Sequence, residues 1–201
     1  KAFFAGLAFG YGLYGVGVSW VYVSLSTYGG MPLWMGSIAV IGFAGILALF
    51  IACTSGFASV FFPPRFRFLA LPFIWVVFEW MKSWVLTGFP WLDIGYTQTP
   101  SWLFSWASVG GVYLVSLMVV VIASLLAIAL NLLLNKGVYR RTKRALLLSL
   151  VAVSAVAFSS FLIDHLEWSK PLGEPVQVGV VQANVPINQK WQAGLRDQLI
   201  S

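Results

Sequence analysis

The chain has 201 residues, of which 60% are hydrophobic and only 9% are charged, and its formal net charge is +6. Soluble domains are about half apolar and about a quarter charged, so a chain of this composition would have too little polar surface to cover itself in water. The composition therefore excludes an ordinary soluble domain. The basic residues stand in short clusters between apolar runs, where they indicate membrane topology and no nucleic-acid interface.

Five apolar segments approach the roughly 20 residues that a membrane-spanning helix needs. They cover residues 2–25, 33–55, 68–86, 109–134 and 145–163. Helices are expected because every backbone N–H and C=O must find a partner within the hydrocarbon. In the first segment, Gly6 and Gly10 form a small-xxx-small pair that allows another helix to approach closely. The predicted fold class is an all-α polytopic membrane helix bundle over residues 1–163.

The positions of lysine and arginine assign the two sides of this bundle. One side carries eight of the twelve basic residues and none of the six acidic ones. These eight are Lys1, Arg65, Arg67, Lys136, Arg140, Arg141, Lys143 and Arg144. The positive-inside rule makes that side cytoplasmic, so residues 87–106 and the C-terminal part are expected outside.

Two ionisable residues, Glu79 and Lys82, stand near the outer end of an otherwise apolar segment. Their i, i+3 spacing places them on one helix face, where they can neutralise each other. Charges within a membrane segment are costly, which makes this pair a candidate functional site. The alternative is an interfacial ion pair in which Lys82 extends its ammonium group to water.

The segment 87–98 that follows combines turn-forming residues with aromatic ones. Its turn residues are Gly88, Pro90 and Gly95, and its aromatic residues are Phe89, Trp91 and Tyr96. Such a mixture at a membrane surface predicts either an interfacial or re-entrant loop that touches lipid, or a structural collar. Elsewhere, Cys53 has no His, Lys or acidic residue near it in sequence that would activate its thiol as a nucleophile, and no metal-ligand spacing is present.

The composition changes after residue 163. Residues 164–174 are polar and predict a linker. The alternating, β-branched run from Val176 to Gln182 predicts a strand, residues 184–189 a loop, and residues 190–200 the first turns of an amphipathic helix. A strand, a loop and a helix in this order predict that residues 175–201 begin an α/β domain, which continues beyond Ser201.

Several motifs resemble the bacterial apolipoprotein N-acyltransferases. They are EWMKSW at residues 79–84, TGFPW at 87–91, GYTQ at 95–98, VGVVQANVP at 178–186, and Lys190 with Trp191. The last two are similar to the start of the nitrilase-like (carbon-nitrogen hydrolase) domain that follows the helices in that family. The order of helices, basic loop and tail also matches, so the resemblance covers essentially the whole chain.

The resemblance implies an acyltransferase of the bacterial inner membrane. Such an enzyme moves an acyl chain from a membrane glycerophospholipid to the N-terminal amino group of a diacylglyceryl-cysteine lipoprotein. A periplasmic Glu, Lys and Cys set would do this through a thioester acyl-enzyme, without cofactor or metal. In the family these three residues lie beyond the position of Ser201, so this fragment is expected to hold no catalytic residue and to be inactive alone. Cys53 does not correspond to the nucleophile.

The resemblance also selects residues for contact with the lipidated substrates. They are Glu79, Lys82, Phe89, Pro90, Trp91, Tyr96, Gln182, Asn184 and Trp191. Two other functions stay open on the sequence. A small-solute transporter would carry charges at mid-membrane or inverted repeats, whereas here the charged pair lies near one end. A structural anchor for a different soluble enzyme would not need the nitrilase-like opening of the tail.

Overall fold

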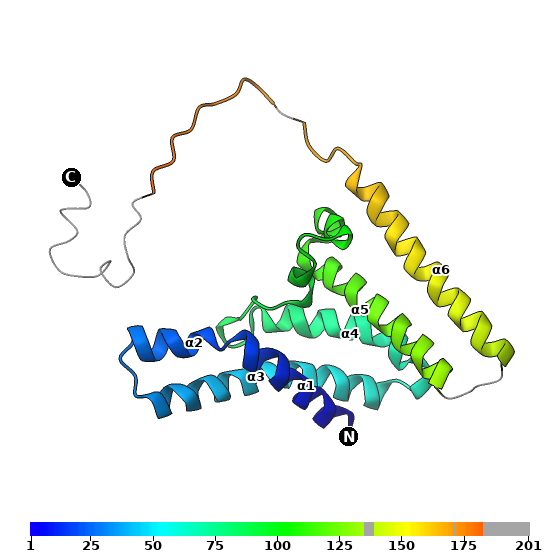
Figure 1. Ribbon diagram of the computed structural model, residues 1–201, viewed down its shortest axis with the longest axis horizontal. Coiled ribbons are helices and arrows are strands. Elements are labelled where there is room, and N and C mark those ends of the chain that lie inside the picture. Colours follow the sequence, from blue (N-terminus) through cyan, green and yellow to red (C-terminus); the bar gives the residue numbers. More distant parts are fainter. Residues whose placement is uncertain (135–138, 171, 183–201) are drawn as a thin grey trace.

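The computed structural model describes residues 1–134, 139–170 and 172–182, and all regular structure in these residues is helical (Figure 1). The α-helices are α1 (Ala2–Gly17), α2 (Trp20–Val23), α3 (Leu33–Phe61), α4 (Pro64–Lys82), α5 (Ala107–Leu134) and α6 (Tyr139–Asp164). A π-helical turn, η1 (Ser24–Tyr28), extends α2. Three short 3₁₀ segments connect α4 to α5, namely η2 (Val85–Thr87), η3 (Ile94–Gln98) and η4 (Trp102–Trp106).

Three of these helical stretches are long and apolar enough to cross a membrane: Leu33–Phe61, Trp102–Leu134 and Leu146–Asp164. A fourth span results if Ala2–Gly17 and Trp20–Tyr28, which meet at a bend of 47°, count as one. Among the described residues the count is therefore three or four, and the expected number of about five is not confirmed. Helix α4 does not qualify because its 19 residues include four charged ones, and it begins and ends earlier than the predicted segment 68–86.

Close packing of α1 on α3 forms the centre of the bundle. A Cβ atom on Gly10 would lie 2.8 Å from the Cα atom of Ala48, and one on Gly6 would lie 2.8 Å from the Ile51 carbonyl oxygen. These positions therefore have to be glycine, which confirms the predicted close helix contact. Farther along both helices, Tyr14 joins α3 side chains in the main buried cluster.

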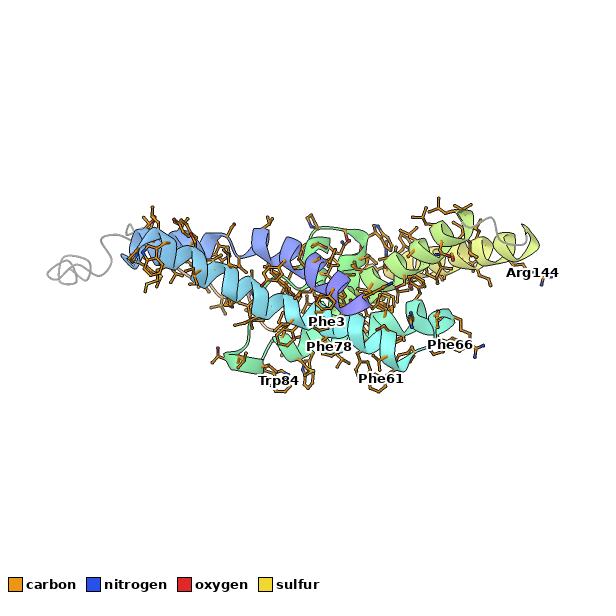
Figure 2. All side chains as sticks on the ribbon, turned by 90° about the horizontal axis from the view of Figure 1, so that it is seen from below. Phe3, Phe61, Phe66, Phe78, Trp84 and Arg144 are labelled. Carbon is orange, nitrogen blue, oxygen red and sulfur yellow. The ribbon has the colours of Figure 1, made fainter. Side chains whose placement is uncertain are left out.

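The remaining helices build outward from this pair. Helix α3 packs against both α1, which crosses it obliquely in Figure 1, and α4; α5 packs across α4, and α6 lies beyond it, against α5 and η4. Large apolar side chains project from the outer surfaces of these helices, as a hydrocarbon surrounding requires. In Figure 2, Phe66 near the start of α4 and Arg144 near the start of α6 lie toward the same end, and Trp84 lies away from them.

The tail differs from its prediction as far as it is described. Residues 172–182 contain no strand, and Val176, Val178 and Val180 are 83%, 76% and 88% exposed. A strand is stabilised by hydrogen bonds and side-chain contacts with a neighbouring strand, and the described residues offer none. The predicted loop 184–189 and helix 190–200 lie outside the described residues.

Candidate functional site

The charged face of α4 points into the protein. Glu79 and Lys82 are only 6% and 1% exposed, although they stand in the last turn and a half of the helix. The alternative arrangement, in which the Lys82 ammonium group reaches water, is therefore wrong. The chain beyond α4 folds back over this face and covers both side chains.

Lys82 is neutralised by an acid from the loop and not by Glu79. The Lys82 Nζ atom lies 2.8 Å from Asp93 Oδ1, and it donates a hydrogen bond of 2.7 Å to the Trp91 carbonyl oxygen. The rings of Tyr14 and Phe89 flank the ammonium group, with centroids 5.5 and 5.8 Å away. Aromatic faces at this distance favour a cation. The predicted Glu79–Lys82 ion pair is replaced by Lys82–Asp93 because the loop brings Asp93, itself 1% exposed, onto the helix.

Glu79 holds the same loop through its backbone. Its Oε1 atom accepts hydrogen bonds from the Ile94 backbone N–H at 2.7 Å and from the Trp75 indole N–H at 3.2 Å. Together, Glu79 and Lys82 fix the loop backbone at residues 91 and 94. Hydrogen bonds that involve a charged group are about twice as strong as neutral ones, so these two residues are the main attachment of the loop to α4.

The turn out of α4 depends on an unusual backbone. Leu86, Thr87 and Gly88 all have positive φ, at 54°, 76° and 83°. A Cβ atom at Gly88 would collide with the Ser83 carbonyl oxygen, and its φ and ψ of 83° and 146° suit only glycine. This turn lets the Phe89 N–H donate to the Lys82 carbonyl oxygen at 2.8 Å. It also places the Phe89 ring, 9% exposed, in the main buried cluster.

The connection between α4 and α5, which contains the loop and ends at Trp106, is attached to α5 and α6. The Gly95 N–H donates to Ser116 Oγ of α5 at 2.9 Å. The Trp106 indole N–H donates to Ser160 Oγ of α6 at 2.8 Å. The loop thereby links α4, α5 and α6.

The side chains of the loop divide into an inner and an outer set. Phe89, Asp93 and Gly95 are buried, whereas Pro90 is exposed and Trp91 and Tyr96 are 60% and 55% exposed. The loop thus presents two aromatic side chains on a backbone that is held from below. Gln182 lies exposed in the tail, far along the chain from this loop, and Asn184 and Trp191 fall outside the described residues.

The buried cluster holds two carboxyl groups against one ammonium group. Glu79 Oε2 and Asp93 Oδ2 have no hydrogen-bond partner in the described part of the chain. Burial raises the pKa of Asp93 to about 6, Lys82 opposes the rise, and the negative charge of Glu79 adds to it. A cavity of about 10 Å³ beside Tyr14, Thr54 and Glu79 has room for about one water molecule.

Sequence reasoning missed Asp93 as a member of this site. One signal was available, because Asp93 is the only acidic residue between Glu79 and Asp164 and stands inside the aromatic loop. No group of three or more metal-ligating side chains occurs among the described residues. Cys53 is exposed on α3 and is not among the residues that line the small cavity beside Glu79. The cluster is therefore suited to hold a loop and a proton, and it carries no nucleophile.

Comparison with known proteins shows which protein family the chain is similar to. Residues 1–125 match the family described as "Apolipoprotein N-acyltransferase N-terminal domain". The apolipoprotein N-acyltransferase of Methylococcus capsulatus is 37% identical over 198 residues, which are 96% of this chain and 37% of that protein. The proteins of the same name from Shewanella oneidensis and Nitrosomonas europaea are also 37% identical, over 95% and 96% of this chain. The chain thus spans little more than a third of the length of these relatives.

Proposed function

The chain belongs to the apolipoprotein N-acyltransferase family, and from this premise we propose that its helices form the lipid-handling membrane part of such an enzyme. The acyl donor would be a membrane glycerophospholipid. The acceptor would be the N-terminal amino group of a diacylglyceryl-cysteine lipoprotein. Both substrates carry acyl chains, so helices that hold them at one surface would orient reactants that water does not dissolve.

The chemistry would belong to the nitrilase-like domain of the full-length enzyme. A cysteine thiolate of that domain would displace the lysophospholipid and keep the acyl chain as a thioester. The lipoprotein amine would then attack the thioester and release the thiolate. Residues 164–174 would link the membrane part to this domain, which would begin within residues 175–201, and the fragment alone would be inactive. Gln182, Asn184 and Trp191 would belong to this catalytic domain and would contact the substrates from there.

One observation carries the proposal for this chain: the loop 88–96 is anchored by buried charges and exposes aromatic side chains. The Lys82 and Glu79 bonds to the backbone hold the loop in place. Trp91 and Tyr96 remain more than half exposed. Indole and phenol rings are suited to the border between hydrocarbon and water, where the glycerol esters of phospholipids lie. Pro90, Trp91 and Tyr96 would therefore contact the lipid substrates, and Glu79, Lys82 and Phe89 would position them.

The distribution of charge supports an orientation for this arrangement. Arg65 and Arg67 stand at the start of α4 and Arg144 near the start of α6, and the anchored loop follows the opposite end of α4. With the basic ends in the cytoplasm, the loop 87–106 and the following domain would face the periplasm. The protein would then be a multi-pass component of the bacterial inner membrane.

The test uses full-length enzyme with the single changes Trp91→Ala and Tyr96→Ala. Trp84→Ala is the matched control, because Trp84 is also exposed, at 54%, and precedes the anchored loop. We expect kcat/KM for the phospholipid donor to fall at least about tenfold in the first two variants, with less than a twofold change in the control. Equal activity of all three variants, with unchanged phospholipid binding, would show that the loop is a structural collar.

A further inference from the structure

A second recess lies at the other end of α4, away from the anchored loop. It is a groove of about 570 Å³ between α1, α3 and α4. Small side chains of α1 and α3, among them Ala2, Ala5 and Ala58, line one side, and Phe68 and Leu71 of α4 line the other. Arg67 and Lys82 are 15 residues apart on α4, which places the groove and the loop about 22 Å apart along the helix.

Among the residues that the structure describes, Arg67 is the only charged one that lines this groove. Its Nε atom donates to the Phe62 carbonyl oxygen at 3.0 Å, and its Nη2 atom donates to the Ser59 carbonyl oxygen at 2.9 Å. A guanidinium group has five N–H donors, and these two bonds hold its plane while leaving others for an anion. The side chain is thus fixed at the groove with unused hydrogen-bonding capacity.

The surroundings of the groove are basic. Lys1 and Arg65 are exposed, and they directly adjoin the lining residues Ala2 and Pro64 in the sequence. No acidic residue occurs before Glu79 in the chain. The potential at this end of the molecule is therefore positive, and it favours an anionic ligand over a neutral one.

We propose that this groove binds one anionic phospholipid, with an acyl chain between α1, α3 and α4 and its phosphate group at Arg67. The volume lies within the roughly 300–1,000 Å³ of ordinary ligand sites. Arginine binds phosphate oxygens through parallel N–H bonds, and basic clusters at the cytoplasmic side attract anionic lipid. This lipid is distinct from the acyl donor, because it sits at the opposite end of α4 from the loop. The lipid fills the space between α4, which carries Glu79 and Lys82, and the neighbouring helices α1 and α3.

The test measures lipid retention by the purified full-length protein in detergent, using native mass spectrometry during titration with phosphatidylglycerol or phosphatidylcholine. We expect one phosphatidylglycerol molecule to bind at least about tenfold more tightly than phosphatidylcholine. Arg67→Gln removes the phosphate contact, and Ala5→Phe fills the groove from an exposed position of α1. Each change should weaken phosphatidylglycerol binding about tenfold or more.

The controls are Arg65→Gln and Ala8→Phe. Arg65 is a neighbouring exposed cation, and Ala8 is an exposed residue of α1 that does not line the groove. Both controls should bind phosphatidylglycerol within twofold of the unmodified protein, as should Trp91→Ala, which separates this site from the donor site. Equal retention of the two lipids, or equal binding by Arg67→Gln and Arg65→Gln, would overturn the proposal. So would an Ala5→Phe variant that loses thermal stability without losing lipid, since a protein segment would then occupy the groove.

Discussion

The Lys82→Met substitution tests whether the buried charges hold the loop. It removes an ammonium group that is 1% exposed and contacts both Asp93 and the Trp91 carbonyl oxygen, while preserving most of the side-chain volume. Asp93 would be left in place without its cation. The expected loss can be worked out contact by contact from the structure.

Two contributions dominate the expected loss of stability at pH 7.5. The charge-assisted hydrogen bond to the Trp91 carbonyl oxygen is worth about 1.5–3 kcal/mol. Asp93 can avoid an unpaired buried charge by binding a proton, which costs at most about 2 kcal/mol, because its pKa of about 6 rises further once Lys82 is gone. The sum, up to about 5 kcal/mol, is consistent with the roughly 3–5 kcal/mol known for breaking one side of a buried ion pair.

The pH dependence gives the prediction a sign. The folded-state pKa of Asp93 lies above its unfolded value, so its favourable contribution is fully present below pH 4 and is lost as the pH rises through about 6. Removing Lys82 takes away the cation that opposes the rise in the pKa of Asp93. The pKa then rises further, and the favourable contribution of protonated Asp93 persists to higher pH. Both proteins gain stability as Asp93 binds a proton, but the variant gains more because the pKa of Asp93 is higher without Lys82, so its deficit should be smaller at pH 5 than at pH 7.5.

The assay is the free energy of unfolding of the reconstituted protein at pH 7.5 and 5. Arg65→Met is the matched control, because it removes an exposed cation from the same helix and should change stability by no more than about 0.5 kcal/mol. The double variant Lys82→Met/Asp93→Leu should recover the part of the loss that comes from Asp93, since no carboxyl group is then left beside the missing cation, but not the part that comes from the hydrogen bond to the Trp91 carbonyl oxygen. A Lys82→Met loss below about 1 kcal/mol, or one of equal size at both pH values, would refute the reasoning.

Three further predictions concern the backbone, the helix contact and the link to α6. Gly88→Ala should destabilise the protein by about 1–3 kcal/mol in thermal unfolding, whereas Gly12→Ala, whose added Cβ meets nothing within 4 Å, should be neutral or stabilising. Gly10→Val should lower the thermal midpoint by forcing α1 away from Ala48, and Gly15→Val, at an open position of the same helix, should not. Trp106→Phe and Ser160→Ala should each cost about 1 kcal/mol and should not add in a double-mutant cycle, because both remove the same hydrogen bond; full additivity would contradict the contact.

The sequence predicted those features that follow from periodicity and composition. The apolar stretches become helices because lipid leaves the backbone no alternative, and Gly6 and Gly10 mark the contact of α1 with α3 because only glycine permits that approach. Counting spans by apolar length was less successful. The first segment bends between α1 and α2. Helix α4 carries charged residues at both ends, and those at its C-terminal end belong to a buried cluster, so it is not a uniformly apolar span.

The candidate site was predicted in part, and the missing part is tertiary. Spacing placed Glu79 and Lys82 on one face, and composition selected the aromatic loop. Their connection through Asp93 depends on a turn with three successive positive φ angles, two of them at Leu86 and Thr87. Residues other than glycine rarely adopt this backbone, so local propensity argues against the turn. The many buried contacts of the loop outweigh that preference.

The attachment of the loop uses main-chain atoms at residues 91 and 94: the Trp91 carbonyl oxygen and the Ile94 N–H. Neither bond depends on which side chain those residues carry. Position 91 can therefore be replaced by a smaller, a charged or an unnatural fluorescent amino acid while the anchor stays intact. Evolution has the same freedom, because drift at this position can change the exposed surface of the loop without first disturbing the fold that supports it.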